Sequence, residues 1–136
     1  MKVFFDTNVL ASALTTRGLC AELFEVVLQS HELLISESVF LELERILPAK
    51  LGQSEAVTKE FIAFLHDIAC VVKGVQPFPS LSDPDDEPII ASALAGQAHV
   101  FVTGDRALLK LQRVVNLPLI SPRQFWEILA SSDEPN

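Results

Sequence analysis

The sequence lacks any long hydrophobic run. None of its apolar stretches approaches the roughly 18 residues that a membrane-spanning helix needs. The first residues also lack the pattern of a signal peptide, because a single lysine is soon followed by an aspartate, Asp6. We therefore expect a cytoplasmic protein.

The chain is also too short for two domains of ordinary size. Its 136 residues are enough to bury one core, and its apolar share of 49% and charged share of 21% match an ordinary globular protein. It contains no internal repeat and no low-complexity tract. The sequence therefore predicts a single domain over residues 1–130 and a disordered tail at 131–136.

Cysteine is scarce, with two residues in the whole chain. Cys20 and Cys70 each lie in an apolar helical or strand context, where free cysteines are usually buried. We predict that both are reduced core residues and that they form no disulfide.

Several catalytic and cofactor motifs are missing. There is no Gly-x-x-x-x-Gly-Lys loop, no Gly-x-Gly-x-x-Gly turn and no Gly-x-Ser-x-Gly elbow. His31, His66 and His99 lie far apart, without the spacing of a zinc site. An aspartyl-phosphate enzyme would carry a second aspartate two residues after Asp6, where this chain has Asn8. Carboxylates remain as the candidate catalytic groups.

What the chain has in excess is negative charge. The formal net charge is −8, which argues against passive, charge-driven binding of nucleic acid. It does not exclude a nucleic-acid enzyme, because a local basic face and a bound metal can dominate where a phosphate docks. The excess of acid also fits a cluster of carboxylates or a basic partner.

Short apolar runs alternate with helical patterns along the chain, which predicts a parallel sheet covered on both faces. The expected strands are 3–5, 32–35, 70–72, 99–102 and 117–120. The expected helices are 9–14, 21–28, 36–47 with Ser36 as N-cap and Pro48 as its end, 54–69, 88–95, one from 106 and one from 122.

Two aspartates directly follow expected strands. Asp6 comes after Val3–Phe5, and Asp105 follows the strand at 99–102. If these strands are neighbours, the two carboxylates meet at the edge where open α/β sheets bind ligands. They would repel each other unless a hard divalent cation lies between them. The alternative is that each aspartate caps the helix that follows it.

Further acids come from two other segments. Glu42 and Glu44 lie about 200° apart around their helix, so at most one of them faces the sheet edge. Four acids lie at the start of the helix at 88–95. A favourable interaction with the helix dipole would account for only one or two of them. These four are Asp83, Asp85, Asp86 and Glu87.

The order of these motifs resembles the PIN domain family, and more narrowly the VapC-like toxins of bacterial toxin–antitoxin systems. The resemblance rests on Phe5-Asp6-Thr7-Asn8-Val9-Leu10, on Ser36 to Leu47, on Asp83-Pro84-Asp85-Asp86 and on Val102-Thr103-Gly104-Asp105, and it extends from Lys2 to about Leu129. It implies a three-layer α/β/α sandwich and a Mg²⁺- or Mn²⁺-dependent ribonuclease. The acids it implies as catalytic and metal-binding residues are Asp6, Glu42, Asp86 and Asp105, supported by Asn8 and Thr103.

The chain departs from the family pattern at one position and is ambiguous at another. Many PIN domains carry a further acid where this chain has Ala107, which weakens the case for a second metal. The third acid is open among the four acids at 83–87. We prefer Asp86 because of its distance from the apolar helix face at 89–91.

The resemblance also implies partners. Arg106, Lys110 and Arg113 are predicted to share one helix face that binds RNA phosphates, although a merely solvated basic face is the alternative. A small antitoxin is expected to cover the acidic groove. The apolar positions 19, 23 and 27 could hold a partner or a second copy, giving a homodimer, or could be ordinary core. A catalytically weak PIN-fold binding module and another metal-dependent phosphoryl hydrolase remain as rival functions.

Overall fold

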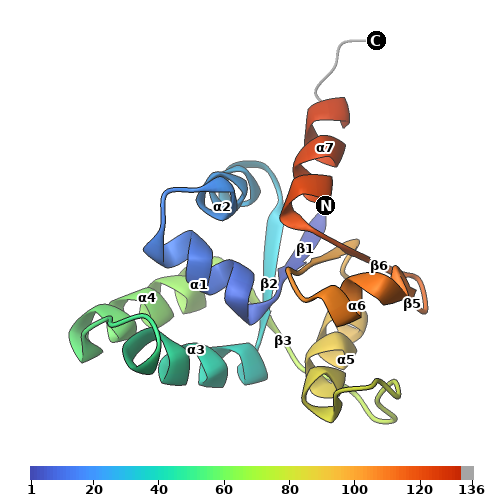
Figure 1. Ribbon diagram of the computed structural model, residues 1–136, viewed down its shortest axis with the longest axis horizontal. Coiled ribbons are helices and arrows are strands. Elements are labelled where there is room, and N and C mark those ends of the chain that lie inside the picture. The colour runs from blue at the N-terminus through green and yellow to red at the C-terminus, as the bar shows by residue number, and fades with distance from the viewer. Residues whose placement is uncertain (133–136) are drawn as a thin grey trace.

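The computed structural model describes residues 1–132 and contains one six-stranded sheet flanked by helices (Figure 1). The strands are β1 (Lys2–Phe5), β2 (Glu32–Ser36), β3 (Cys70–Val72), β4 (Val100–Val102), β5 (Arg113–Val114) and β6 (Leu117–Ile120). The helices are α1 (Thr7–Thr15), α2 (Leu19–Ser30), α3 (Glu37–Ala49), α4 (Glu55–Ile68), the 3₁₀ turn η1 (Pro84–Asp86), α5 (Glu87–Ala95), α6 (Arg106–Leu111) and α7 (Pro122–Ser132).

The sheet has the strand order β3-β2-β1-β4-β6-β5, and all pairs are parallel except β5 with β6. β1 and β4 are direct neighbours, with Phe5 in register with Val102. The predicted α/β class with a central parallel sheet is confirmed. The carboxyl ends of β1 and β4, where Asp6 and Asp105 follow, therefore lie side by side.

The core lies on both faces of the central strands, which is why these strands read as continuous apolar runs. Phe4 and Phe101, on neighbouring strands, stack with ring centroids 5.2 Å apart. On the other face Phe5 meets Phe125 of α7 edge to face at 6.1 Å. All four rings are fully buried, and each is worth about 2 kcal/mol or more in burial alone. This packing makes the end of β1 a rigid support.

Serine caps place two of the helices. The side chain of Ser36 accepts a hydrogen bond from the backbone N–H of Val39 at 3.2 Å, as the sequence predicts. The prediction that Pro48 ends this helix is wrong, because α3 continues to Ala49. In the last turn a proline removes only one hydrogen bond, so the helix tolerates it there.

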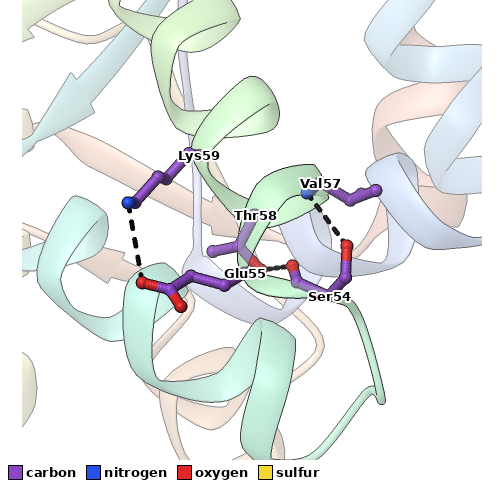
Figure 2. Close-up of polar contacts among 5 residues, drawn as sticks. All are labelled: Ser54, Glu55, Val57, Thr58 and Lys59. Atoms are coloured by element: carbon purple, nitrogen blue, oxygen red, sulfur yellow. Dashed lines mark hydrogen bonds and ion pairs between the residues drawn. The ribbon is translucent and has the colours of Figure 1, made fainter.

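The same capping chemistry begins α4 (Figure 2). Ser54 Oγ accepts from the N–H of Val57 at 3.1 Å, and Thr58 Oγ1 donates back to the carbonyl of Ser54 at 2.9 Å. Lys59 pairs with Glu55 across one turn at 3.5 Å, but both side chains are exposed, so this pair adds little stability. The hydroxyl cap therefore fixes where α4 begins.

The strand β5 was not predicted, and it contains Arg113, which was expected on a helix. Arg113 was expected on the helix that begins at Arg106, but α6 ends at Leu111 and Arg113 lies in β5. Gln112 and Val115 adopt positive φ angles of 62° and 56°, and these turn the chain back into an antiparallel hairpin. The prediction of one helix face for all three basic residues is therefore wrong.

The prediction that both cysteines are core residues is wrong for Cys70. Cys70 is exposed on β3 at the edge of the sheet, while Cys20 is half-buried, and both thiols are free. Conversely, Leu23 and Val27 of α2 belong to the core, and Leu19 is half-buried against it. Of the two alternatives that the sequence left open for this face of α2, ordinary core is the one that the structure supports. These positions therefore give no support to a homodimer.

The C-terminal helix α7 runs through Ser131 and Ser132, which were predicted to belong to the tail. The rest of that predicted tail, 133–136, lies outside the described residues. Within residues 1–132, no helix combines the length and the apolar character needed to cross a membrane.

Candidate active site

Asp6 is fixed at the end of β1 by three hydrogen bonds. Its backbone N–H donates to the carbonyl of Val102 on β4 at 2.9 Å, which extends the sheet ladder. Its Oδ1 accepts from the N–H of Thr7, and its Oδ2 accepts from the hydroxyl of Thr103, each at 2.8 Å. Asp6 is thus the N-cap of α1 and also faces the loop that follows β4.

Thr103 joins the two strand-end aspartates. Its side chain is fully buried, and its Oγ1 accepts from the backbone N–H of Asp105 at 3.0 Å while donating to Asp6. Asp105 in turn caps α6, because its Oδ1 accepts from the N–H groups of Ala107 at 2.8 Å and Leu108 at 3.4 Å. The capping alternative is therefore correct for both aspartates, and it is compatible with the two carboxylates being neighbours.

Glu42 reaches the same place from the middle of α3. It is half-buried, and its negative charge contributes to raising the pKa of Asp6 and of Asp86. Glu44, two residues further along, is exposed. The helical geometry of the sequence therefore separated these two glutamates correctly.

Asp86 is the acid of the 83–87 segment whose pKa is raised by burial and also by the charges of Asp6, Asp105 and Glu42. Burial raises its pKa to about 6, with additional contributions from Asp83, Asp6, Asp105 and Glu42. It is the cap residue of α5, but its side chain makes no capping hydrogen bond.

The other acids of that segment are engaged locally or exposed. Asp83 Oδ1 accepts from the N–H of Asp85 at 2.9 Å, and Glu87 Oε2 accepts from the N–H of Leu81 at 3.0 Å. Asp85 is exposed. Their hydrogen bonds shape the turn η1, and they leave Asp86 as the carboxylate that the turn presents to the other three.

Asp6, Glu42, Asp86 and Asp105 form what we call the acidic cluster. The pKa of Asp6 is raised by burial, and the charges of Glu42 and Asp105 add to this, while the hydrogen bonds from Thr103 and Thr7 act in the opposite direction. The ion pairs seen in residues 1–132 lie elsewhere, on α4 and α7. The cluster therefore carries unneutralised and mutually repulsive charge.

A hard divalent cation fits this donor set, because Mg²⁺ and Mn²⁺ prefer carboxylate oxygens. The hydroxyl of Thr7, next to Asp6, is buried and has no hydrogen-bond partner in the described part of the chain, as expected beside a site for an ion or water. In residues 1–132 no three acidic, histidine or cysteine side chains are arranged, as they stand, to hold an ion. Chemistry and charge thus support a metal site, while the present arrangement does not enclose one.

A small cavity of about 160 Å³ opens beside the cluster. Three acids form its polar side and leucines of α6 and of the loop before η1 form its apolar side. Its lining residues are Leu81, Ser82, Asp83, Asp86, Asp105, Ala107, Leu108 and Leu111. Ala107 contributes to this wall.

The predicted supporting and substrate-binding residues divide into two groups. Thr103 is buried in the site, whereas Asn8 is exposed on the first turn of α1. Arg106 and Lys110 are exposed one turn apart on α6, and Arg113 is exposed on β5. The feature next to Asp6 that sequence reasoning missed is the buried, unpartnered hydroxyl of Thr7, which in the sequence has the pattern of an ordinary first helical residue.

The family assignment follows from the sequence as a whole. The sequence model of the PIN domain family matches residues 2–107, which include all four acids of the cluster. The chain belongs to the PIN domain family. No curated protein sequence matches it.

Solved structures agree with this fold. The chain is similar to VapBC2 from Rickettsia felis, solved bound to a DNA fragment from their promoter, with a TM-score of 0.67, 16% identity and coverage of 89% of this chain and 98% of that one. It is similar to VapBC-1 from nontypeable Haemophilus influenzae, with a TM-score of 0.63, 20% identity and coverage of 90% and 99%. It is also similar to the PIN domain endonuclease Utp24, with a TM-score of 0.52, 18% identity and coverage of 88% and 84%.

Proposed function

We propose that this PIN domain is a metal-dependent endoribonuclease and the toxin of a toxin–antitoxin pair. The observation that carries the proposal is the convergence of Asp6, Glu42, Asp86 and Asp105 at one edge of the sheet. Carboxylates gathered from different elements, two of which, Asp6 and Asp86, have pKa values raised by burial and by neighbouring negative charge, are typical of a catalytic site. Membership of the PIN family and the likeness to an endonuclease of the same fold support nuclease chemistry.

The four acids would hold Mg²⁺ or Mn²⁺. We assign Asp6 and Asp105 as direct ligands, with Asp86 and Glu42 binding directly or through water. A bound divalent ion supplies Lewis acidity, activates water and offsets charge on the phosphate.

The chain's own residues would prepare the reaction. Thr103 and Thr7 hold the carboxylate of Asp6 in one orientation, and the cap of α6 does the same for Asp105. Such supports keep ligands in place when substrate binds. Asp86 makes no capping hydrogen bond, so its oxygens are available to bind the ion directly or through water. Asn8 would assist from the first turn of α1 by orienting water.

Substrate phosphates would be held by Arg106, Lys110 and Arg113. The first two lie on α6 directly beyond Asp105, and Arg113 follows on β5. Because Arg113 lies in a different element from Arg106 and Lys110, we expect the three side chains to contact more than one phosphate along a strand. Basic side chains beside an acidic centre reconcile a net charge of −8 with RNA as substrate.

The expected protein partner is an antitoxin. Two solved structures similar to this chain are VapBC assemblies, and one was solved with DNA from their promoter. By this likeness we infer a small partner whose basic segment enters the acidic groove and blocks it in the cytoplasm, where the RNA is. Expression of the chain without a partner should slow bacterial growth, and Asp6→Asn should relieve this.

A second candidate is a catalytically weak PIN-fold binding module or a different phosphoryl hydrolase. The observation that favours it is Ala107, which places a methyl group beside Asp105 where a further carboxylate would strengthen metal binding. This rival predicts either no turnover or turnover of another phosphate ester.

Substrate assays separate these functions. The purified chain is incubated with single-stranded RNA, DNA of the same sequence and a phosphate monoester, each with Mg²⁺, with Mn²⁺ or with EDTA. We expect cleavage of RNA alone, and only with the metal. Hydrolysis of the monoester, or metal-independent cleavage, would refute the proposal.

A further inference from the structure

Positive charge is segregated in this molecule. Four of the ten lysines and arginines lie in residues 106–126, and none of the 18 aspartates and glutamates does. We call this segment the basic flank. It comprises α6, β5, β6 and the first half of α7, and its basic residues are Arg106, Lys110, Arg113 and Arg123.

The topology brings both ends of the basic flank to the acidic cluster. β4 and β6 are paired in parallel, with Val102 opposite Ile120, so α6 and α7 both begin at the edge where Asp105 lies. Phe125 of α7 packs on Phe5, the residue directly before Asp6, at 6.1 Å. The first turns of α7 are therefore anchored beside the end of β1.

Trp126 lies on α7 next to this anchor. It is the single tryptophan of the chain, and 44% of it is exposed. The guanidinium of Arg123 lies over its ring at 5.5 Å from the centroid, within the range of a cation–π contact. Arg123 also pairs with Glu127 at 3.5 Å. An exposed aromatic ring with a guanidinium stacked on it is the surface on which unpaired bases stack.

We propose that Trp126 and Arg123 form a stacking platform for one unpaired base of a single-stranded RNA whose backbone crosses the acidic cluster. This inference rests on the proposed function and adds a specificity element to it. Charge favours RNA over a protein segment as the occupant, because the inferred antitoxin segment is basic and the basic flank would repel it. Phosphates on either side of the stacked base would meet Arg123 and Arg106.

The single tryptophan makes the test direct, because the chain has no tyrosine and its fluorescence reports on Trp126. Asp6→Asn protein, used so that RNA is not consumed, is titrated with single-stranded RNA and with a duplex of the same length. We expect saturable quenching by the single strand and much weaker quenching by the duplex, whose bases are already stacked.

Affinity measurements with a labelled single strand complete the test. In the Asp6→Asn background, Trp126→Ala should weaken binding about tenfold, and Trp126→Phe should keep most of it, because stacking needs only an aromatic ring. The matched control is Phe64→Ala. Phe64 is also 44% exposed but lies on α4, which leads into β3 at the opposite edge of the sheet from β5. This control should bind like the parent.

The outcomes separate the platform from the proposed function. Saturable RNA binding without a change in fluorescence, or equal binding by Trp126→Ala and Phe64→Ala, overturns the platform and leaves the ribonuclease proposal standing. Quenching by an antitoxin but not by RNA also overturns it, since the surface then belongs to a protein partner. If the parent protein neither cleaves nor binds RNA, the proposed function itself fails and the platform fails with it.

Discussion

One edge of the sheet carries two regions of opposite character. The acidic cluster is assembled from the residue after β1, from α3, from η1 and from the β4–α6 loop, which are far apart in the sequence. The basic flank, residues 106–126, is a single continuous stretch. In the cluster Asp6 is half-buried and held by hydrogen bonds from Thr7 and Thr103, whereas the basic side chains of the flank are exposed.

The difference indicates that the two regions have different roles in the reaction. A metal site needs carboxylates in fixed positions. The folded sheet supplies such positions, and the four acids are held there although their charges repel one another. A flexible RNA strand needs long basic side chains that adapt to it, and a continuous surface segment is sufficient for that. The cluster should therefore control the chemical step, and the flank should control substrate binding.

The largest effect should come from removing one charge of the cluster. Asp6→Asn keeps a capping side chain for α1 and removes a ligand charge, so the variant should fold and lose about 10³-fold or more of its RNase activity. Initial rates of cleavage with saturating Mn²⁺, together with circular dichroism, measure both properties. Parental cleavage by the folded variant would remove Asp6 from the active site.

Two glutamates of α3 can be compared, one that faces the acidic cluster and one that is exposed. Glu42→Gln should lower the turnover number about 10- to 100-fold, because Glu42 faces the cluster, as its effect on the pKa of Asp6 and Asp86 indicates. Glu44→Gln is the matched control on the same helix and should leave turnover unchanged, because Glu44 is exposed. If both variants lose activity equally, the loss comes from a disturbance of α3 and not from the removal of a carboxylate at the active site.

Changes in the basic flank should affect binding rather than turnover. Arg106→Gln should raise KM several-fold, leave the turnover number close to the parental value, and reduce the slope of log affinity against log salt by about 0.7, as expected for one lost phosphate contact. Arg17→Gln, an exposed arginine in the turn before α2, is the control. A fall in the turnover number with unchanged KM would contradict the division between the two regions.

The smallest effect should be on the stability of the metal-free protein. Asp86 has a pKa of about 6 when folded against an ordinary value of 3.8, so the folded state holds more protons between these values. The free energy of unfolding should therefore fall as pH rises from about 4 to 6, and the raised pKa of Asp6 acts in the same direction. Asp86→Asn should raise the melting temperature at pH 7 by about 3 °C and weaken this pH dependence. A lower melting temperature than that of the parent at pH 7 in EDTA would show that Asp86 is not repelled.

The sequence was a good guide to the acids because each depends on a local pattern. Asp6 and Asp105 directly follow apolar strands, so the parallel sheet determined their meeting. Helical geometry showed that at most one of Glu42 and Glu44 faces the site, and the family resemblance selected Glu42. Asp86 was preferred on its distance from an apolar helix face, and the hydrogen bonds of Asp83 and Glu87 explain physically why those acids are occupied elsewhere.

The features that sequence reasoning missed depend on tertiary contacts or on unusual backbone angles. The two-residue strand β5 exists because Gln112 and Val115 adopt positive φ angles, which no hydrophobic pattern reveals. Helical spacing identified the apolar face of α2 but left open whether the core or a partner covers Leu23 and Val27, because that depends on tertiary packing. The bridge that Thr103 makes between two aspartates likewise requires β1 and β4 to be placed first.

The most direct test of the central claim is a thermal unfolding experiment with Mn²⁺ on the parent and on Asp105→Asn. If the acidic cluster is one metal site, Mn²⁺ should raise the melting temperature of the parent, by an amount equivalent to roughly 2.7 kcal/mol at a hundredfold excess over Kd, and EDTA should reverse the change. The shift should largely disappear in Asp105→Asn and persist in Glu44→Gln. An equal shift in all three proteins would place the metal elsewhere and contradict the account.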